Sequence, residues 1–250
     1  MIQYFSMGNL AKISVIILTN GTILDETLKS LIGFDEVVII NTGESPFETL
    51  LPNAVVITYP YDGDLTRAIG IAKAKHNWIL SIDSDEVLTP ELIKEINALR
   101  LTENIAYSIP FKNFFNGRFI RGCGWYPDRH VRLFNRKKTG FQPVRIHSSV
   151  MTGGLEVKKL KGAILHYSYR SIHDFLQKMQ LYSDLYATEY GKSKKSSLSK
   201  AIWHGFFAFL RSYVIKRGFL DGKEGWIISA YQGHMAYYKY LKLMEISHSC

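Results

Sequence analysis

The sequence predicts an α/β fold, with a mainly parallel, Rossmann-like sheet in the N-terminal part and a basic, helical C-terminal extension. Three observations favour this fold class. Four short runs in the first 82 residues are mainly apolar and rich in β-branched residues, which is typical of buried parallel strands. Segments with helical spacing alternate with these runs. From residue 171 onward, apolar residues recur every three or four positions.

The N-terminal part is expected to run β-α-β-α-β-α-β-α, with residue ranges assigned to the four strands and to three of the four helices. Strands are expected where the apolar runs end in polar or glycine-containing turns, at residues 13–18, 36–40, 54–59 and 78–82. Helices are expected where apolar residues follow helical spacing, at residues 25–34, 65–75 and 90–100. Thr89 is the expected N-cap of the last helix, with Pro90 at its first position.

The pattern changes after residue 105. Shorter strands are expected at residues 105–111, 131–134 and 162–169, and helices from residue 171, at 198–217 and at 225–245. We therefore expect three parts, residues 1–105, 106–169 and 170–250. In a parallel sheet, ligands bind beyond the carboxyl ends of the strands. The polar segments after the first, second and fourth strands would lie there.

Composition bounds the class of protein. The 250 residues include 46% apolar residues, which excludes wholesale disorder. Two cysteines are too few for a disulfide framework, which favours a reducing cytoplasm. No secretory signal pattern is seen at the N-terminus. The net charge of +9 points to an acidic partner.

The charge is unevenly distributed. Residues 1–105 carry 7 Lys and Arg against 14 Asp and Glu, a balance of −7. Residues 106–150 carry 9 against 1, and residues 151–250 carry 15 against 7, so each has a balance of +8. A strongly basic portion therefore follows an acidic one.

Residues 201–215 form an apolar run that is too short to span a membrane, since a spanning helix needs about 20 apolar residues. A helix lying on the membrane surface would turn apolar side chains to lipid and place basic ones near anionic headgroups. The first set is Trp203, Phe206, Phe207, Phe209 and Leu210, and the second is Lys200, Arg211, Lys216 and Arg217. An ordinary packed pair of helices explains the run equally well.

The main chemical signal is Asp83-Ser84-Asp85 after the fourth strand. Residues two apart in an extended segment face the same side, so two carboxylates share one space. A divalent cation would relieve their repulsion, and Mg²⁺ or Mn²⁺ is typically held by one or two carboxylates plus substrate phosphates. A calcium loop is excluded, because Leu88 and Lys94 occupy the positions that need Gly and Glu. An aspartyl-phosphate phosphatase also uses D-x-D-x-[TV], which residues 83–87 fit. It is a remote alternative, because its nucleophile normally follows the first strand of its fold, whereas here three strands precede the one that leads to Asp83.

Residues 13–101 resemble the nucleotide-sugar-binding half of a family 2 glycosyltransferase with the GT-A fold, and the best-matching stretch is residues 78–86, a strand that runs into D-x-D-E before a helix. Further segments are similar to the bacterial lipopolysaccharide core glucosyltransferase subgroup. These are residues 124–128, 131–134, 146–147, 165–168, Tyr182 and 218–222. The resemblance implies that residues 1–105 bind the donor, that 106–169 form the acceptor side, and that 170–250 form a helical region suited to membrane association.

The resemblance also implies roles for individual residues on the donor side. Thr19 and Asn20 would contact the nucleotide, and Asn41 would hydrogen-bond the edge of the base. Arg67 would substitute for the Arg-Asn pair that the family often carries before its third helix. Asp83 would approach the ribose or sugar.

The remaining roles concern the metal and the acceptor. Asp85 would ligate Mn²⁺ or Mg²⁺, and His147 would complete that site or contact the diphosphate. Asp128 is the expected catalytic base, because inversion needs a carboxylate within reach of the acceptor hydroxyl. Trp125 would stack on a sugar face, and Arg132 would bind an anionic acceptor.

The expected activity is metal-dependent transfer of a hexose, with inversion, from a UDP-sugar to a lipopolysaccharide core acceptor. The enzyme would be cytoplasmic, peripheral on the inner membrane of a Gram-negative bacterium, and bound to an anionic glycolipid. Departures from the family pattern at Gly21, Asn41, Gly70 and Ser148 leave open a catalytically inactive nucleotide-sugar-binding module. A nucleic-acid-binding protein is a remote alternative, because the sequence contains no recognised nucleic-acid motif.

Overall fold

The structure is a computed structural model that describes residues 12–62, 64–141, 149–191 and 193–248. The chain divides into two compact units. One consists of Met1–Phe111 and Arg129–His166, and the other of Lys112–Asp128 and Tyr167–Cys250. We call them the sheet unit and the helical unit.

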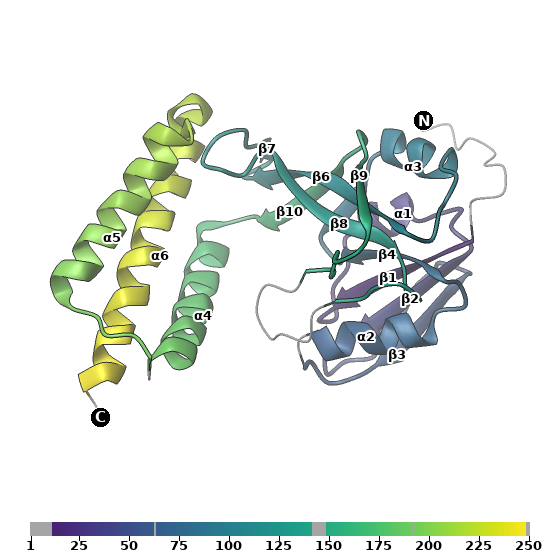
Figure 1. The fold of residues 1–250 in the computed structure, drawn as a ribbon, viewed down its shortest axis with the longest axis horizontal. Helices are drawn as coiled ribbons and strands as arrows, with labels where there is room; N and C mark the ends of the chain where they lie inside the picture. Colours follow the sequence, from purple (N-terminus) through teal and green to yellow (C-terminus); the bar gives the residue numbers. More distant parts are fainter. Residues whose placement is uncertain (1–11, 63, 142–148, 192, 249–250) are drawn as a thin grey trace. The chain divides into compact units, whose positions relative to one another are not determined.

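Four parallel strands form one half of the sheet, in the order β3-β2-β1-β4 (Figure 1). They are β1 (Ile13–Thr19), β2 (Glu36–Asn41), β3 (Ala54–Thr58) and β4 (Trp78–Asp83). Beyond β4 the order continues β8-β6-β10-β5, with β8 antiparallel to β4 and β5 antiparallel to β10. These strands are β5 (Glu86–Leu88), β6 (Ile105–Phe115), β8 (Asp128–Asn135) and β10 (Ile164–Tyr169), while β7 (Arg118–Phe119) and β9 (Glu156–Lys159) pair with β6.

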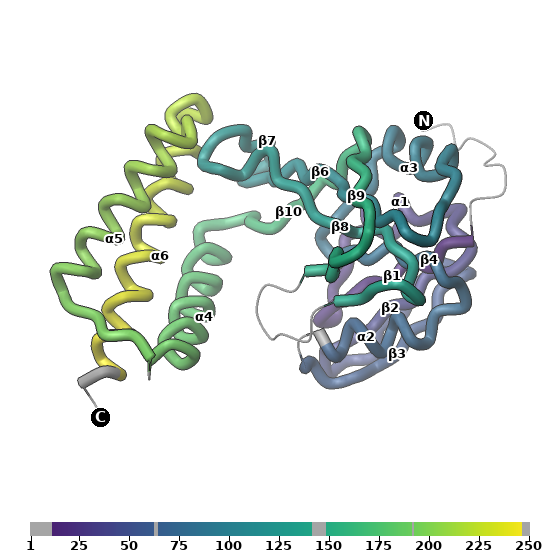
Figure 2. Tube along the Cα trace, in the orientation of Figure 1, coloured from purple at the N-terminus to yellow at the C-terminus, as the bar shows by residue number. Residues whose placement is uncertain are grey.

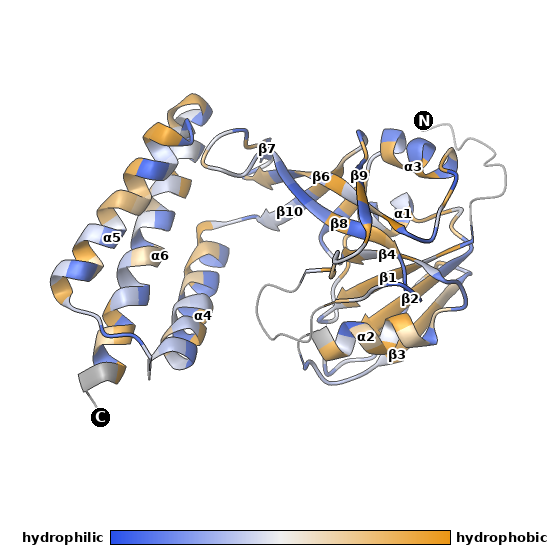
Figure 3. Ribbon diagram, in the orientation of Figure 1, coloured by the Kyte–Doolittle hydropathy of each residue, from blue (hydrophilic) through white to orange (hydrophobic). Residues whose placement is uncertain are grey.

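Helices cover both faces of the parallel strands because those strands bury both of their faces. Alternate residues of β1 belong to two separate clusters: Val15 and Ile17 to one, and Ile16 to the other. The first cluster is closed by residues of α3 (Pro90–Asn97) and by those around α1 (Asp25–Ser30), and the second by residues of α2 (Asp64–Lys73) and the residue after it. Figure 3 shows β1, β2 and β4 as hydrophobic along most of their length. This layering places the polar strand ends at the edge of the sheet.

The helical unit contains three long helices, α4 (Ile172–Tyr190), α5 (Leu198–Leu210) and α6 (Gly222–His248). A π-helical turn, Arg211–Ile215, and a 3-10 turn, Gly218–Asp221, connect α5 to α6. Helices α5 and α6 run side by side in opposite directions (Figure 2). They approach closely at glycines, since a Cβ on Gly205 would lie 3.2 Å from the Gly233 carbonyl oxygen, and one on Gly233 3.1 Å from that of Gly205.

The outer face of α5 exposes large apolar side chains. Trp203, Phe206 and Phe207 are each more than half exposed. Phe209 differs from the expectation for the surface-lying helix, because it is half-buried and its ring packs 5.0 Å from Trp226. Leu210 is half-buried as well. Among the described residues, no helix combines the length and hydropathy needed to cross a membrane.

The fold class expected from the sequence is confirmed: a Rossmann-like, mainly parallel α/β domain with a C-terminal helical extension. The Thr89 cap is also confirmed, because its Oγ1 accepts a hydrogen bond from the Leu92 amide at 3.2 Å. The strict alternation was wrong, because residues 42–53 connect β2 to β3 without a helix and β5 lies between β4 and α3. The helix expected at 198–217 ends its α-helical part at Leu210.

Candidate active site

The carboxyl ends of the parallel strands bring several expected site residues to one edge of the sheet. The register pairs Thr19 with Asn41 and Leu18 with Asp83. The chain moves outward from β1 to β2 and β3, then returns to β4 on the other side of β1. The space between the ends of β1 and β4 is therefore a topological switch point, where open α/β sheets bind their ligands.

Asp83, at the end of β4, is held by two arginines. Its Oδ1 accepts a hydrogen bond from Arg67 on α2, and its Oδ2 lies 3.3 Å from the Arg132 guanidinium of β8. Burial alone would raise the pKa of Asp83, but the charges of Arg67 and Arg132 outweigh it and hold that pKa far below its usual value. Asp83 is therefore a fixed anion at the strand end.

Arg67 is itself buried and oriented by β4. Its guanidinium donates hydrogen bonds to Ser81 Oγ at 2.7 Å and to the Ile82 carbonyl at 3.3 Å, and lies 5.3 Å from the Phe141 ring centroid. This arrangement fixes the position of the arginine and, through it, of Asp83.

Glu86 completes a buried charge cluster behind Asp83. It is fully buried, its Oε1 accepts a 2.6 Å hydrogen bond from Arg132, and its Oε2 accepts one from the Asp83 amide at 3.0 Å. Burial and the nearby charges of Asp83 and Asp85 outweigh the attraction of Arg132 and raise the pKa of Glu86 to about 8. Through its hydrogen bond from the Asp83 amide, Glu86 holds the turn that carries Asp85 in place.

Asp85 differs from its two acidic neighbours. The described residues place no hydrogen-bond donor on its carboxylate, and its side chain is 31% exposed, against 36% for Asp83 and 0% for Glu86. The nearest basic group is His166 on β10, with Nε2 at 3.7 Å. The antiparallel pairing of β10 with β5, which matches His166 to Glu86, brings this histidine to the site.

A divalent cation fits this donor set. Mg²⁺ and related ions are usually bound through one or two carboxylates plus substrate phosphates. Asp85 offers an accessible carboxylate, and His166 adds a nitrogen beside it. The described residues contain no group of three or more metal-ligating side chains. Expected ligand His147 lies outside them.

The loops after β1 and β2 are built by the other expected donor-side residues. The Thr19 hydroxyl donates to the Thr22 carbonyl at 2.6 Å and accepts from the Gly21 amide, whereas Asn20 is exposed. Asn41 is fully buried, with Nδ2 donating to the Ser45 carbonyl at 2.8 Å. As placed, Asn41 shapes the loop, and its role in reading a base stays a prediction.

The expected base and stacking residue both belong to the helical unit. Asp128 Oδ2 accepts a 3.3 Å hydrogen bond from the Asn113 amide, which also donates to the Trp125 carbonyl at 3.0 Å. The Trp125 indole is half-buried and stacks on Tyr169, with ring centroids 5.5 Å apart. Asn113 thus ties the two residues together.

The structure brings Thr19, Asn20, Asn41, Arg67, Asp83, Asp85 and Arg132 together in the sheet unit. Arg132 contacts Asp83 and Glu86, so its expected role with the acceptor stays a prediction. The expectations from the sequence above include no role for Glu86 or His166. Only the pairing of β10 with β5 distinguishes His166 from any other histidine within a strand.

No family model matches the sequence. The chain is similar to a curated protein of Rickettsia prowazekii (strain Madrid E) named an uncharacterized glycosyltransferase, with 27% identity over 233 residues, covering 85% of this chain and 79% of that protein. A protein of the same name from Rickettsia bellii (strain RML369-C) is 26% identical over 263 residues, covering 96% and 88%. Among solved structures, S. aureus TarS 1–349 in complex with UDP aligns with a TM-score of 0.45 at 17% identity, covering 96% of this chain and 91% of that one.

Proposed function

We propose that this chain is a nucleotide-sugar-dependent glycosyltransferase. More specifically, it transfers a hexose with inversion, with glucose as the leading candidate, from a UDP-sugar to a lipopolysaccharide or lipooligosaccharide core acceptor, and it depends on Mn²⁺ or Mg²⁺. The observation that carries the proposal is the pair of carboxylates at the β1–β4 switch point: Asp83 is held by arginines, whereas the partly exposed Asp85 receives no hydrogen bond from the residues that the structure describes. The names of the curated Rickettsia relatives support the same class of enzyme.

The donor binds at the carboxyl ends of β1, β2 and β4. Thr19, Asn20 and Asn41 form the nucleotide side, and Asp83 faces the ribose or sugar. Asp85, with His166 beside it and His147 as a further candidate, holds the divalent cation. When bound, that cation neutralises charge on the leaving diphosphate. Arg67 keeps Asp83 ionised and in place, so that the donor site is preorganised.

Asp128 acts as the base on the acceptor side. The acceptor hydroxyl oxygen forms a bond to the anomeric carbon, the bond from that carbon to the diphosphate oxygen breaks, and UDP leaves with the electron pair. The hydroxyl proton passes to the Asp128 carboxylate. Attack opposite the leaving group inverts the anomeric centre. The amide of Asn113 orients Asp128 for this step, and Trp125 stacks on the acceptor sugar.

The acceptor is an anionic glycolipid, and the enzyme acts in the cytoplasm, bound peripherally to the inner membrane of a Gram-negative bacterium. The basic balance beyond residue 105 and the exposed aromatic face of α5 support this location.

Donor turnover tests the proposal. UDP release from UDP-glucose with Mn²⁺ is measured for the wild type, for Asp85→Asn, and for Asp184→Asn, which removes an exposed carboxylate paired with Lys242 in the helical unit. We expect Asp85→Asn to lose at least about a hundredfold in turnover, because one interaction with developing charge is worth that much, and Asp184→Asn to stay near the wild type. Undiminished turnover in Asp85→Asn would exclude the assigned metal site.

A thermal-shift screen of UDP-, GDP- and TDP-sugars with and without Mn²⁺ identifies the nucleotide. A ligand at a hundred times its Kd stabilises by about 2.7 kcal/mol, which raises the melting temperature by roughly 5–10 °C. A shift without any turnover would favour the inactive nucleotide-sugar-binding module. The engagement of both Asp83 oxygens by arginine is the observation that favours that alternative.

A further inference from the structure

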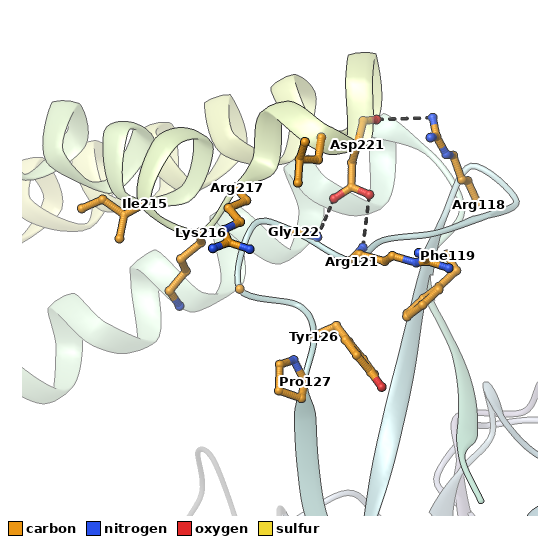
Figure 4. Close-up of a pocket in the computed structure, with 12 residues that line it drawn as sticks. Arg118, Phe119, Arg121, Gly122, Tyr126, Pro127, Ile215, Lys216, Arg217 and Asp221 are labelled. Carbon is orange, nitrogen blue, oxygen red and sulfur yellow. Dashed lines mark hydrogen bonds between the residues drawn. The ribbon is translucent and has the colours of Figure 1, made fainter.

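An open pocket of about 890 Å³ lies within the helical unit, apart from the carboxylates of the sheet unit. One wall comes from residues 118–127, and the other from the turns that connect α5 to α6. In Figure 4, Lys216 and Arg217 project from those turns, while Tyr126 and Pro127 lie on the facing segment. The function proposed above does not use this pocket.

The pocket is strongly basic. Four cationic side chains line it, namely Arg118, Arg121, Lys216 and Arg217, against one carboxylate, Asp221. Arg118 is balanced by the buried Glu224 at 3.2 Å. The described residues offer no carboxylate within ion-pair distance of the other three cations. These three cations share the pocket with one carboxylate, that of Asp221, so a net charge of about +2 remains for a ligand.

The Asp221 carboxylate is bound to the backbone and not to any of these three cations. It is buried, and its two oxygens accept hydrogen bonds from the Arg121 amide at 3.2 Å and the Gly122 amide at 2.5 Å (Figure 4). These bonds clamp the segment 121–122 against the turn that carries Asp221. The clamp fixes the two walls of the pocket relative to each other.

Backbone geometry fixes the walls further. Arg217 and Cys123 both adopt left-handed backbone conformations, with φ of 55° and 57°, which are costly for residues other than glycine and persist only where the surroundings enforce them. A Cβ on Gly124 would lie 2.4 Å from Lys216 Nζ, so glycine makes room for this ammonium. The pocket is a built feature and not a gap between mobile side chains.

The rim of the pocket is apolar and exposed. Ile215 and Leu220 line the pocket and are 75% and 64% exposed. Their neighbours Val214 and Phe219 are about half exposed. A site for a soluble anion needs no such rim, whereas a lipid headgroup brings acyl chains that apolar side chains can contact. Cations inside an apolar rim match the phosphate and the tail of a membrane lipid.

We propose that this pocket binds the phosphomonoester headgroup of a membrane lipid, with Ile215 and Leu220 entering the acyl region. A phosphomonoester is favoured over a phosphodiester because its charge of about −2 matches the net charge of about +2 better than a charge of −1 does. Arg121 and Arg217 supply bidentate hydrogen bonding, and Lys216 supplies a point charge. This inference names the lipid that the enzyme binds at the membrane, and it rests on the proposed function for the membrane association itself.

Vesicle binding of the full chain tests this site. Sedimentation is measured with vesicles of phosphatidylcholine alone, with phosphatidic acid, and with enough phosphatidylglycerol to match the charge. We expect the wild type to prefer phosphatidic acid, and Arg121→Gln/Lys216→Gln to bind those vesicles about tenfold or more weakly. Lys158→Gln/Lys159→Gln, which removes the same charge from the exposed strand β9, should retain the preference.

Two further variants separate the lipid from other ligands and from folding effects. Ile215→Ser/Leu220→Ser should weaken vesicle binding but leave unchanged the rise in melting temperature that inorganic phosphate gives. Asp85→Asn should bind vesicles like the wild type, so failure of sugar transfer and failure of this site are distinguishable. Equal loss in the pocket and β9 variants, no preference for phosphatidic acid, or stabilisation by inorganic phosphate without vesicle binding would each overturn the proposal.

Discussion

Arg132 links two carboxylates of the buried cluster, and replacing it tests how that cluster is held. Arg132→Met keeps much of the apolar stem but removes the guanidinium that lies 2.6 Å from Glu86 and 3.3 Å from Asp83. Glu86 is fully buried and the Arg132 side chain is 13% exposed, so neither group is well solvated. Removing one partner of such a pair typically costs about 3–5 kcal/mol.

The loss of unfolding free energy in Arg132→Met should depend on pH, because a protonated Glu86 carries no charge that Arg132 must compensate. Its pKa is about 8 with Arg132 present, and losing the positive charge raises it further. At about pH 6 the variant holds a neutral Glu86 and loses mainly hydrogen bonds, at about 1–2 kcal/mol. At about pH 8.5 the wild-type Glu86 has lost most of its proton whereas the variant keeps it, and this difference in proton binding adds at most about 1 kcal/mol to the loss.

Urea unfolding followed by tryptophan fluorescence at both pH values measures these losses. Lys138→Met, which breaks an exposed ion pair with Glu103, is the control and should cost less than about 1 kcal/mol at either pH. In a Glu86→Gln background, the Arg132→Met loss should no longer grow with pH. A loss in Arg132→Met that is independent of pH, or no larger than that of the control, would refute this account of the cluster.

Three further predictions concern the helical unit. Asp174 accepts backbone hydrogen bonds from Arg170 and Ser171, which lower its pKa despite partial burial. Asp174→Ala should therefore lower the free energy of unfolding by about 1 kcal/mol at neutral pH. The difference from the wild type should vanish as the pH falls through the lowered pKa. Cys123 is 1% exposed with a pKa raised by burial, so in a Cys250→Ser chain a thiol reagent should label it at the rate of unfolding, and rapid labelling of the native chain would contradict its burial. Gly225→Ala should destabilise by about 1–3 kcal/mol or more, because the new Cβ would lie 1.8 Å from the Gly218 carbonyl, whereas Gly153→Ala, which meets nothing within 4 Å, should melt like the wild type.

The parallel half of the fold was predictable because its signals are local. Runs such as that of β1 are apolar on both faces, and a sheet covered on both sides requires this of each strand by itself. The placement of Asp83 at a strand end follows from the same run. Strand β5 has three residues, too few for any periodicity, and the helix-free connection from β2 to β3 has no distinguishing pattern.

The contacts of the site were less predictable, because they depend on pairing between distant segments. Arg132 reaches Asp83 only because β8 lies antiparallel to β4, and the basic stretch around it suggested an acceptor role instead. His166 lies beside Asp85 only because β10 pairs with β5. Neither strand pairing can be recognised from the local sequence. Residue type and spacing could therefore mark these side chains as candidates but could not predict which residues they contact.

The glycine contact between α5 and α6 separates what holds this hairpin together from what it displays. Because the two backbones meet at Gly205 and Gly233, that crossing needs no large side chain from either helix. The aromatic residues Trp203, Phe206 and Phe207 are consequently not needed to pack between the helices at that point, and they stay more than half exposed. Polar substitutions on the outer face of α5 can therefore change what this face binds without altering the contact between α5 and α6.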